Sequence, residues 1–161
     1  MKSLLKRVLT IALVFALAVP ATVISVSADP GDVVTMTQGE TTKNYPSINA
    51  AIADTQEYDS KVNKTQYVIT LLEDTKEDVV IPAGRSIKID LAGHTLTNVS
   101  DHTIYNNSTK IYITDSSADK SGVVDNITHG KGAVYNNINA IIFLEGGTFM
   151  RSKEASADES T

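Results

Sequence analysis

A phrase of thirteen residues occurs twice in the chain, and this repetition constrains the fold more than any other feature. The stretch from Thr103 to Asp115 reads TIYNNSTKIYITD, and the stretch from Ala133 to Glu145 reads AVYNNINAIIFLE. The two copies start thirty residues apart, and they share their alternation of residue types as well as their composition. Repeats of this length are typical of solenoids, in which each unit covers its hydrophobic face by stacking on the next.

A second pair of similar segments supports a short repeat. The segment IDLAGHTL, from Ile89 to Leu96, resembles IFLEGGTF, from Ile142 to Phe149, at a separation of fifty-three residues, which is close to two repeats. Between Thr65 and Met150 the apolar runs are short, rich in β-branched residues and divided by turn residues, as expected for strands. The sequence therefore predicts an all-β fold, and a solenoid of strands is a parallel β-helix, here with three to four coils.

Equivalent residues of neighbouring parallel strands lie about 4.8 Å apart, so the thirty-residue repeat also predicts a register. It stacks Tyr105, Asn106 and Asn107 on Tyr135, Asn136 and Asn137, and Ile111, Ile113 and Asp115 on Ile141, Phe143 and Glu145. Side chains alternate between the two faces of a strand. We expect the inward set to be Ile104, Asn106, Val134 and Asn136, and the outward set to be Tyr105, Asn107, Tyr135 and Asn137.

The paired asparagines have two interpretations. If Asn106 and Asn136 point inward, each amide can donate to its neighbour and accept from it, which forms an asparagine ladder. A buried amide without partners costs about 1–3 kcal/mol, so such a ladder would be essential to the fold. Alternatively, both pairs are exposed turn asparagines.

The first residues predict export. Lys2, Lys6 and Arg7 precede an apolar run from Val8 to Val19. Val26 and Ala28 occupy the two small-residue positions that precede a signal-peptidase cleavage site, which predicts cleavage after Ala28. We interpret residues 1–28 as a signal peptide. The predicted location is therefore extracellular, either as a secreted protein or in association with the cell surface. The alternative is an uncleaved anchor, although the run is shorter than the roughly 20 residues of a membrane span.

Charge and cysteine content exclude several classes of function. The leader contains three of the fourteen basic residues and none of the nineteen acidic ones, so its removal makes the remaining chain more acidic than the net charge of −5 for the whole. This balance disfavours nucleic acid and, after cleavage, an anionic membrane as partners. The absence of cysteine excludes thiolate zinc sites, disulfides and cysteine nucleophiles.

The expected organisation has four parts. After the leader, residues 29–66 form an N-terminal segment with one strand-like run, VVTMT, and one short amphipathic helix in YPSINAAIAD. Residues 67–152 form the coils, and residues 153–161 are a polar tail that we interpret as the point of truncation of a longer protein. With no second amphipathic segment after the last coil, the open strand edges there predict end-to-end self-association.

Several phrases carry a resemblance to a known family: TLLEDTKEDVVIPAGRSIKIDLAGHTLTN, IYITDSS, HGKGAVYNN and LEGGTFMRS. Together, over roughly Ser47 to Ser152, the chain resembles the N-terminal part of secreted, pectate-lyase-like, right-handed β-helix surface proteins of anaerobic gut-type bacteria. The resemblance implies a right-handed coil, a helix that caps its N-terminal end and an adhesin-like role at the cell surface. Such proteins are usually longer and have more coils.

Few residues suggest chemistry, and no catalytic residue is assigned. Under the repeat, Asp115 and Glu145 stack, and two carboxylates about 5 Å apart could hold a calcium ion or act as an acid pair. Alternatively, they are solvated turn residues. The sequence therefore predicts no cofactor and no metal site, with calcium at Asp115 and Glu145 as the alternative. His94 aligns with Gly147 and is interpreted as a turn residue in a left-handed conformation, and the three histidines are too scattered for a metal site.

Tyr105 and Tyr135, flanked by Asn107 and Asn137, are the best candidates for ligand binding. Two outward rings on one face suit sugars, although tyrosine also covers sheets that bind nothing. The predicted function is a non-enzymatic, secreted or cell-surface β-helix segment that serves as a structural spacer or as an adhesin-like module for glycans or host-surface components. The alternative is a truncated polysaccharide lyase or glycoside hydrolase domain.

Overall fold

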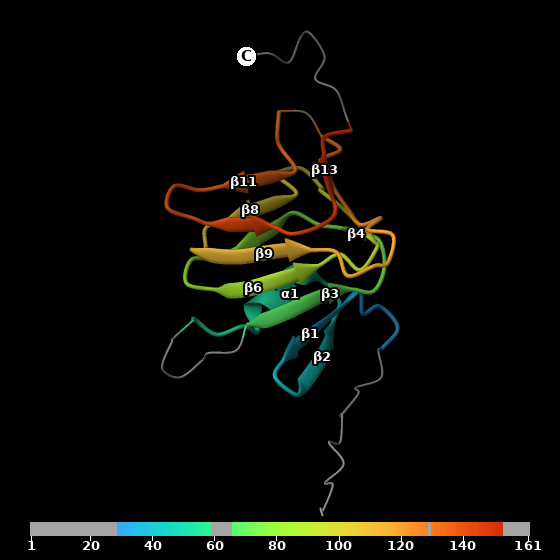
Figure 1. Cartoon of the computed structure of the whole chain (residues 1–161), viewed down its shortest axis with the longest axis vertical. Coiled ribbons are helices and arrows are strands. Elements are labelled where there is room, and N and C mark those ends of the chain that lie inside the picture. The colour runs from blue at the N-terminus through green and yellow to red at the C-terminus, as the bar shows by residue number, and fades with distance from the viewer. Residues whose placement is uncertain (1–28, 59–65, 129, 153–161) are drawn as a thin grey trace, which may run out of the picture.

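A computed structural model describes residues 29–58, 66–128 and 130–152 (Figure 1). Within these ranges the chain is mostly β-strand with almost no helix, so the prediction of an all-β fold is confirmed. The expected leader, residues 1–28, and the polar tail, residues 153–161, lie outside the described residues. In the part that the structure describes, no helix is both long enough and apolar enough to cross a membrane.

The elements follow one another with short connections. In chain order they are β1 (Val34–Gln38), β2 (Thr41–Tyr45), α1 (Ile48–Ala53), β3 (Tyr67–Leu71), β4 (Thr75–Lys76), β5 (Val79–Ile81), β6 (Ser86–Asp90), β7 (Thr95–Thr97), β8 (Ile104–Asn106), β9 (Lys110–Thr114), β10 (Val123–Asp125), β11 (Val134–Asn136), β12 (Ile142–Leu144) and β13 (Thr148–Met150).

From β3 onward the chain visits three sheets in a fixed rotation. It passes from a six-stranded sheet, ordered β12-β9-β6-β3-β1-β2, to a four-stranded sheet, β13-β10-β7-β4, and then to a three-stranded sheet, β11-β8-β5. From β6 onward, each strand pairs in parallel with the strand of the same sheet one circuit earlier. We call one circuit a layer, and Figure 1 shows β9 beside β6 and β11 above β8 in successive layers.

The predicted register is confirmed for the repeated Tyr-Asn pair. Strands β8 and β11 are parallel, with Tyr105 opposite Tyr135 and Asn106 opposite Asn136. Ile104 and Asn106 are fully buried and Tyr105 is half-buried, as the alternation predicts. The thirty-residue repeat therefore reports true structural equivalence at this strand.

The predicted register is wrong by one residue at the next strand. Ile111 lies opposite Ile142, and Ile113 lies opposite Leu144, so the repeat here is thirty-one residues. The extra residue is accommodated in the turn before β12, where Asn139 adopts a φ of 65° and the Ala140 N–H donates to the Asn137 carbonyl. Phe143 consequently lies beside Tyr112 on the outer face and does not cover Ile113.

The N-terminal segment contains more strand than the sequence predicts. The run VVTMT forms β1, but the polar segment TTKNY forms a second strand, β2, which pairs with β1 as a hairpin. The threonine hydroxyls of Thr37 and Thr42 lie 3.0 Å apart across this pair. Strand β1 is antiparallel to β3, and the short strand β4 lies within the polar segment EDTKED.

The predicted helix is confirmed as α1, and its apolar face is buried through Ile48, Ala51 and Ile52. The side chain of Ser47 accepts a hydrogen bond from the Ala50 N–H, which caps the first turn. The carboxylate of Glu77 accepts two more N–H groups, from Ile48 and Asn49, at 2.8 and 2.9 Å. Because an isolated six-residue helix is unstable in water, these contacts and its packing keep it folded.

The core lies between the three sheets and is formed by their inward residues, with those of β1 and α1. The largest fully buried side chains are Ile48, Ile69, Leu71, Ile81, Ile87, Ile89, Leu91, Leu96, Ile104, Ile111, Ile113 and Val34. In the last layer the covering is incomplete: Leu144, opposite the buried Ile113, is 53 % exposed. Self-association at this end remains a prediction.

Asn106 is the buried amide expected from the repeat. Its Nδ2 donates to Oδ1 of Asn136 at 2.7 Å, and its Oδ1 accepts from the Ser108 N–H at 2.9 Å. Asn136 in turn donates to the carbonyl of Ala140 at 2.7 Å. The interpretation as a ladder is therefore confirmed for this pair, although Asn136 itself is exposed because no strand covers β11 on its other side in the described part of the chain.

We expect Asn106→Leu to lower the free energy of unfolding by about 1–3 kcal/mol, because it leaves the Ser108 N–H without a partner in the interior and removes the donor to Oδ1 of Asn136. Urea denaturation monitored by circular dichroism measures this loss. Asn107→Leu, one residue later and on the outer face, is the matched control and should change stability by less than about 1 kcal/mol. Equal losses in the two variants would contradict an inward role for Asn106.

Candidate functional site

The outer face of the three-stranded sheet carries an aligned column of apolar and aromatic side chains. Val80, Tyr105 and Tyr135 are opposite one another across β5, β8 and β11. Val80 is 50 % exposed and Tyr135 is 41 % exposed. The two tyrosine rings are stacked, with centroids 4.8 Å apart and an interplanar angle of 22°. Strand alternation explains this exposure, because it buries their neighbours Ile104 and Asn106.

His102 extends the aromatic surface at the start of β8. The centroid of its ring is 4.9 Å from the Tyr135 ring and 6.2 Å from the Tyr105 ring. The Gly132 N–H donates to Nδ1 of His102 at 2.9 Å, so a backbone group of the layer above fixes the orientation of the imidazole. Three rings from two layers thus form one continuous surface.

A groove of about 370 Å³ lies beside this surface. The residues that line it come from β5 and β8, from the loop that precedes each, and from the position directly after β8: Asp78, Val80, Ser100, Asp101, His102, Tyr105 and Asn107. At the far end of β8, Asn137 donates to Oδ1 of Asn107 at 2.7 Å, which holds that amide in place. The groove therefore has an apolar floor, two carboxylates at one end and amides at the other.

Asp78 folds the loop that borders the groove. Its carboxylate accepts hydrogen bonds from the backbone N–H groups of Val99, Ser100 and Asp101 and from the Ser100 hydroxyl. Burial alone would raise the pKa of Asp78, but these hydrogen bonds outweigh it and hold the pKa below its ordinary value. Asp78 is therefore ionised at neutral pH.

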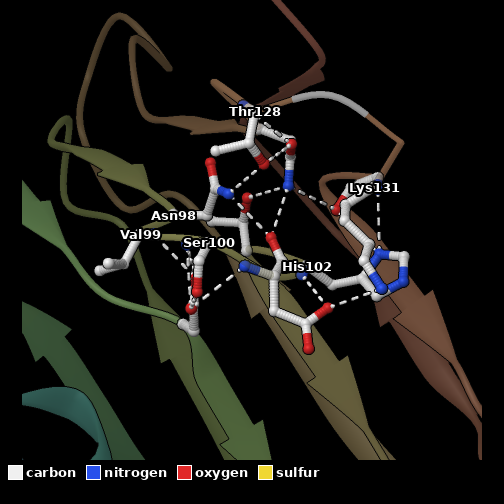
Figure 2. A network of polar contacts seen from close by, with 11 residues as sticks. Asn98, Val99, Ser100, His102, Thr128 and Lys131 are labelled. Carbon is white, nitrogen blue, oxygen red and sulfur yellow. Dashed lines mark hydrogen bonds and ion pairs between the residues drawn. The ribbon is translucent and has the colours of Figure 1, made fainter. Parts of the chain in front are cut away.

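Asp101 is the more exposed of the two carboxylates. Its Oδ1 accepts from the His102 N–H at 2.8 Å and lies 3.4 Å from the Lys131 ammonium (Figure 2). The pKa of Asp101 is lowered, first by the hydrogen bond from the His102 backbone and further by Lys131. Both carboxylates of the groove thus carry negative charge at neutral pH.

Two buried asparagines support this loop from inside. Asn98 donates to the Asp101 carbonyl at 2.8 Å, and Asn126 donates to the same carbonyl at 2.9 Å and to that of Gly132 at 3.2 Å. Asn98 also accepts from the Ile127 N–H at 2.7 Å. Figure 2 shows Asn98 and Thr128 within this network, next to the loop of Val99 and Ser100. The network fixes the backbone of Asp101, directly before His102.

The sequence analysis found part of this site and missed the rest. Tyr105 and Asn107 line the groove, and Tyr135 and Asn137 lie beside them, so the structure brings all four predicted residues together. Asp78, Asp101 and His102 were missed because they lie in loops outside the repeated phrase. The sequence did contain a sign of the buried asparagines that support the loop. Asn98 and Asn126 each follow directly after a strand of the same sheet, β7 and β10, and so occupy similar positions in neighbouring layers.

The predicted pairing of Asp115 with Glu145 is wrong. The one-residue change of register places Gly146 against Asp115, where a Cβ atom at Gly146 would lie 2.9 Å from the Asp115 nitrogen. Glu145 is exposed and pairs with Lys88 at 3.2 Å. The alternative, a solvated turn residue, is also wrong for Asp115, since this side chain is buried and accepts from the N–H groups of Gly93, Ser117 and Gly122.

His94 does lie at a turn, since its N–H donates to the Leu91 carbonyl at 2.8 Å. The expected left-handed conformation is wrong for His94 itself, because the positive φ angles of this turn belong to Ala92 and Gly93. Nowhere in residues 29–58, 66–128 and 130–152 do three or more acidic or histidine side chains gather in a way that could hold a metal ion.

A second aromatic pair lies on the six-stranded sheet. Tyr112 and Phe143 stack with centroids 4.8 Å apart and an angle of 16°, and the ammonium of Lys88 lies 5.6 Å from the Tyr112 ring. Neither ring lines the groove. This pair provides a matched comparison for the tyrosines of the groove.

Comparison with known proteins gives no match: no family model, no curated protein and no solved structure is significantly similar to this chain. The geometry of the site therefore carries the functional argument alone.

Asp115 gives a pH-dependent contribution to stability. Burial would raise its pKa, but the hydrogen bonds from Ser117, Gly122 and Gly93 lower it overall. A carboxyl with a lowered pKa stabilises the fold above its unfolded-state pKa of about 3.9, and this contribution is lost as the pH falls toward the folded-state value.

We therefore expect Asp115→Asn to reduce the free energy of unfolding by about 1–3 kcal/mol at neutral pH, and the difference from the wild type to shrink as the pH falls below about 3.9. Urea titrations at several pH values measure this difference. Asp119→Asn, in the same turn but exposed, should have a smaller effect. A difference for Asp115→Asn that is constant with pH would refute this account.

Proposed function

We propose that the chain is a segment of a right-handed parallel β-helix, with α1 as its N-terminal cap. The proposal is supported by the fixed rotation through three sheets, by parallel pairing of every layer with the previous one, and by the single core that all three sheets share. The handedness follows from the resemblance and from the strong preference of parallel crossover connections for the right-handed form. The N-terminal sequence supports secretion or display at the cell surface.

We infer further that the segment is a non-enzymatic glycan-binding module of adhesin-like type. The observation that carries this inference is the stack of Tyr105 on Tyr135 beside the groove. Exposed aromatic rings favour the apolar face of a sugar ring, and their rigid side chains lose little entropy on binding. The amide of Asn107 and the hydroxyl of Ser100 lie in the groove wall, where they can hydrogen-bond to sugar hydroxyls.

The binding test is a glycan array followed by calorimetry of the oligosaccharides that bind. We expect Tyr135→Ala to weaken binding by about tenfold or more, because about 1.4 kcal/mol of stacking energy corresponds to a factor of ten in Kd. Phe143→Ala is the matched control, since it removes an exposed ring from the other aromatic pair and should leave Kd unchanged.

Thermal melting of both variants establishes that each is folded before binding is compared. Equal effects of Tyr135→Ala and Phe143→Ala would contradict a site at the groove. Absence of binding by the wild-type protein to neutral, acidic and amine-bearing glycans would remove the glycan-binding function and leave the structural role.

A further inference from the structure

The charge around the groove is one-sided. Among the described residues that line it, the formally charged side chains are Asp78 and Asp101, and both carry lowered pKa values. Lys131 contacts Asp101 from the layer above and is not among the residues that line the groove. A ligand in the groove therefore meets net negative charge.

Asp101 has an oxygen atom free to bind a ligand. The His102 N–H and the Lys131 ammonium both contact Oδ1, and no contact with Oδ2 is found within the described residues. By contrast, both oxygens of Asp78 accept hydrogen bonds from the loop. Asp101 can thus contact a donor on the ligand directly, while Asp78 contributes mainly through its charge.

The aromatic rings favour the same sign of ligand charge. The face of a tyrosine ring attracts cations within about 6 Å of its centroid, and the attraction is stronger where water is excluded. Tyr105 lines the groove together with Asp101, so a cation between them would interact favourably with both. A carboxylate or sulfate at the same place would be repelled by the two acidic residues.

We propose that the groove selects sugars that carry a cationic nitrogen, that is, hexosamines with a free or alkylated amine, over neutral and acidic sugars. This inference rests on the proposed glycan-binding function and specifies its ligand class. The ammonium group donates to Oδ2 of Asp101 and lies near the Tyr105 ring, and the apolar face of the sugar packs on the tyrosine stack.

The test compares three oligosaccharides of equal length by calorimetry at pH 7.5: an N-acetylglucosamine oligomer, its N,N,N-trimethylated analogue with permanent charge, and a galacturonate oligomer. Because the trimethylated probe cannot donate a hydrogen bond, a free-amine glucosamine oligomer is measured as well, at about pH 6, where an amine resembling an α-amino group is protonated. We expect both cationic probes to bind about three- to tenfold more tightly than the neutral oligomer, and the acidic oligomer to bind most weakly.

The ionic strength and the variants refine the test. The preference for the cationic probes should fall as salt is raised from about 20 mM to about 300 mM, because exposed charges are screened. Asp101→Asn keeps an acceptor for the His102 N–H and should reduce the preference, whereas Lys131→Met removes the competing cation and should increase it. Glu145→Gln removes an exposed carboxylate on another sheet and should change nothing.

The outcomes separate this inference from the proposed function. Equal affinity of the wild-type protein for cationic and neutral oligomers would overturn the inference and leave glycan binding intact. Failure to bind any of the oligomers would overturn both. If Asp101→Asn were unfolded, Lys131→Met would still decide the matter, because an unchanged or reduced preference in that variant would overturn the role of the Asp101 carboxylate.

Discussion

Parallel pairing of each strand with the strand one circuit earlier is the constraint on which the rest of the structure depends. It places equivalent side chains about 4.8 Å apart, so one choice of inward residue is repeated from layer to layer. Val79, Ile104 and Val134 form one such inward column of the three-stranded sheet, and Val80, Tyr105 and Tyr135 form the outward column of the same sheet. The register that buries isoleucine therefore also exposes the tyrosines.

Buried asparagine amides connect the interior to the candidate site. At the corners between strands, backbone groups turn away from the sheets and need partners inside the protein. Asn98 and Asn126 supply them beneath the loop that carries Asp101 and His102, and Asn106 does so at the next corner. Hydrogen bonds of these buried amides therefore help to fix the geometry of the loop and the outer sheet face that form the groove.

Much of the fold could be predicted from the sequence, because alternation and repetition are local signals. The strands, the helix at Ile48–Ala53 and the register of Tyr105 with Tyr135 follow from them. The register at β12 could not be predicted, since a single extra residue in a turn shifts it and is invisible to a fixed repeat length. Strand β2 was missed because its polar residues gain their pairing from β1 and have little strand-like pattern of their own.

The candidate site was predicted only where it coincides with the repeat. Tyr105 and Asn107 belong to the repeated phrase, whereas Asp78 comes from an earlier layer and reaches the groove through the stacking of layers. Asp78 is held by the backbone N–H groups of Val99 and Asp101. Because nearly every residue type has such a group, the sequence does not indicate that these N–H groups bind Asp78.

The spacing between stacked strands varies while the stacking itself does not. Tyr67 lies opposite Ile87, which follows it by 20 residues, whereas Ile111 lies opposite Ile142, which follows it by 31. The number of residues between stacked strands therefore differs from one circuit to the next while the parallel pairing of the strands is kept. Such a scaffold can change the loops beside its outer faces by insertion and deletion, while the stacked strands keep both their buried side chains and the exposed column of Val80, Tyr105 and Tyr135.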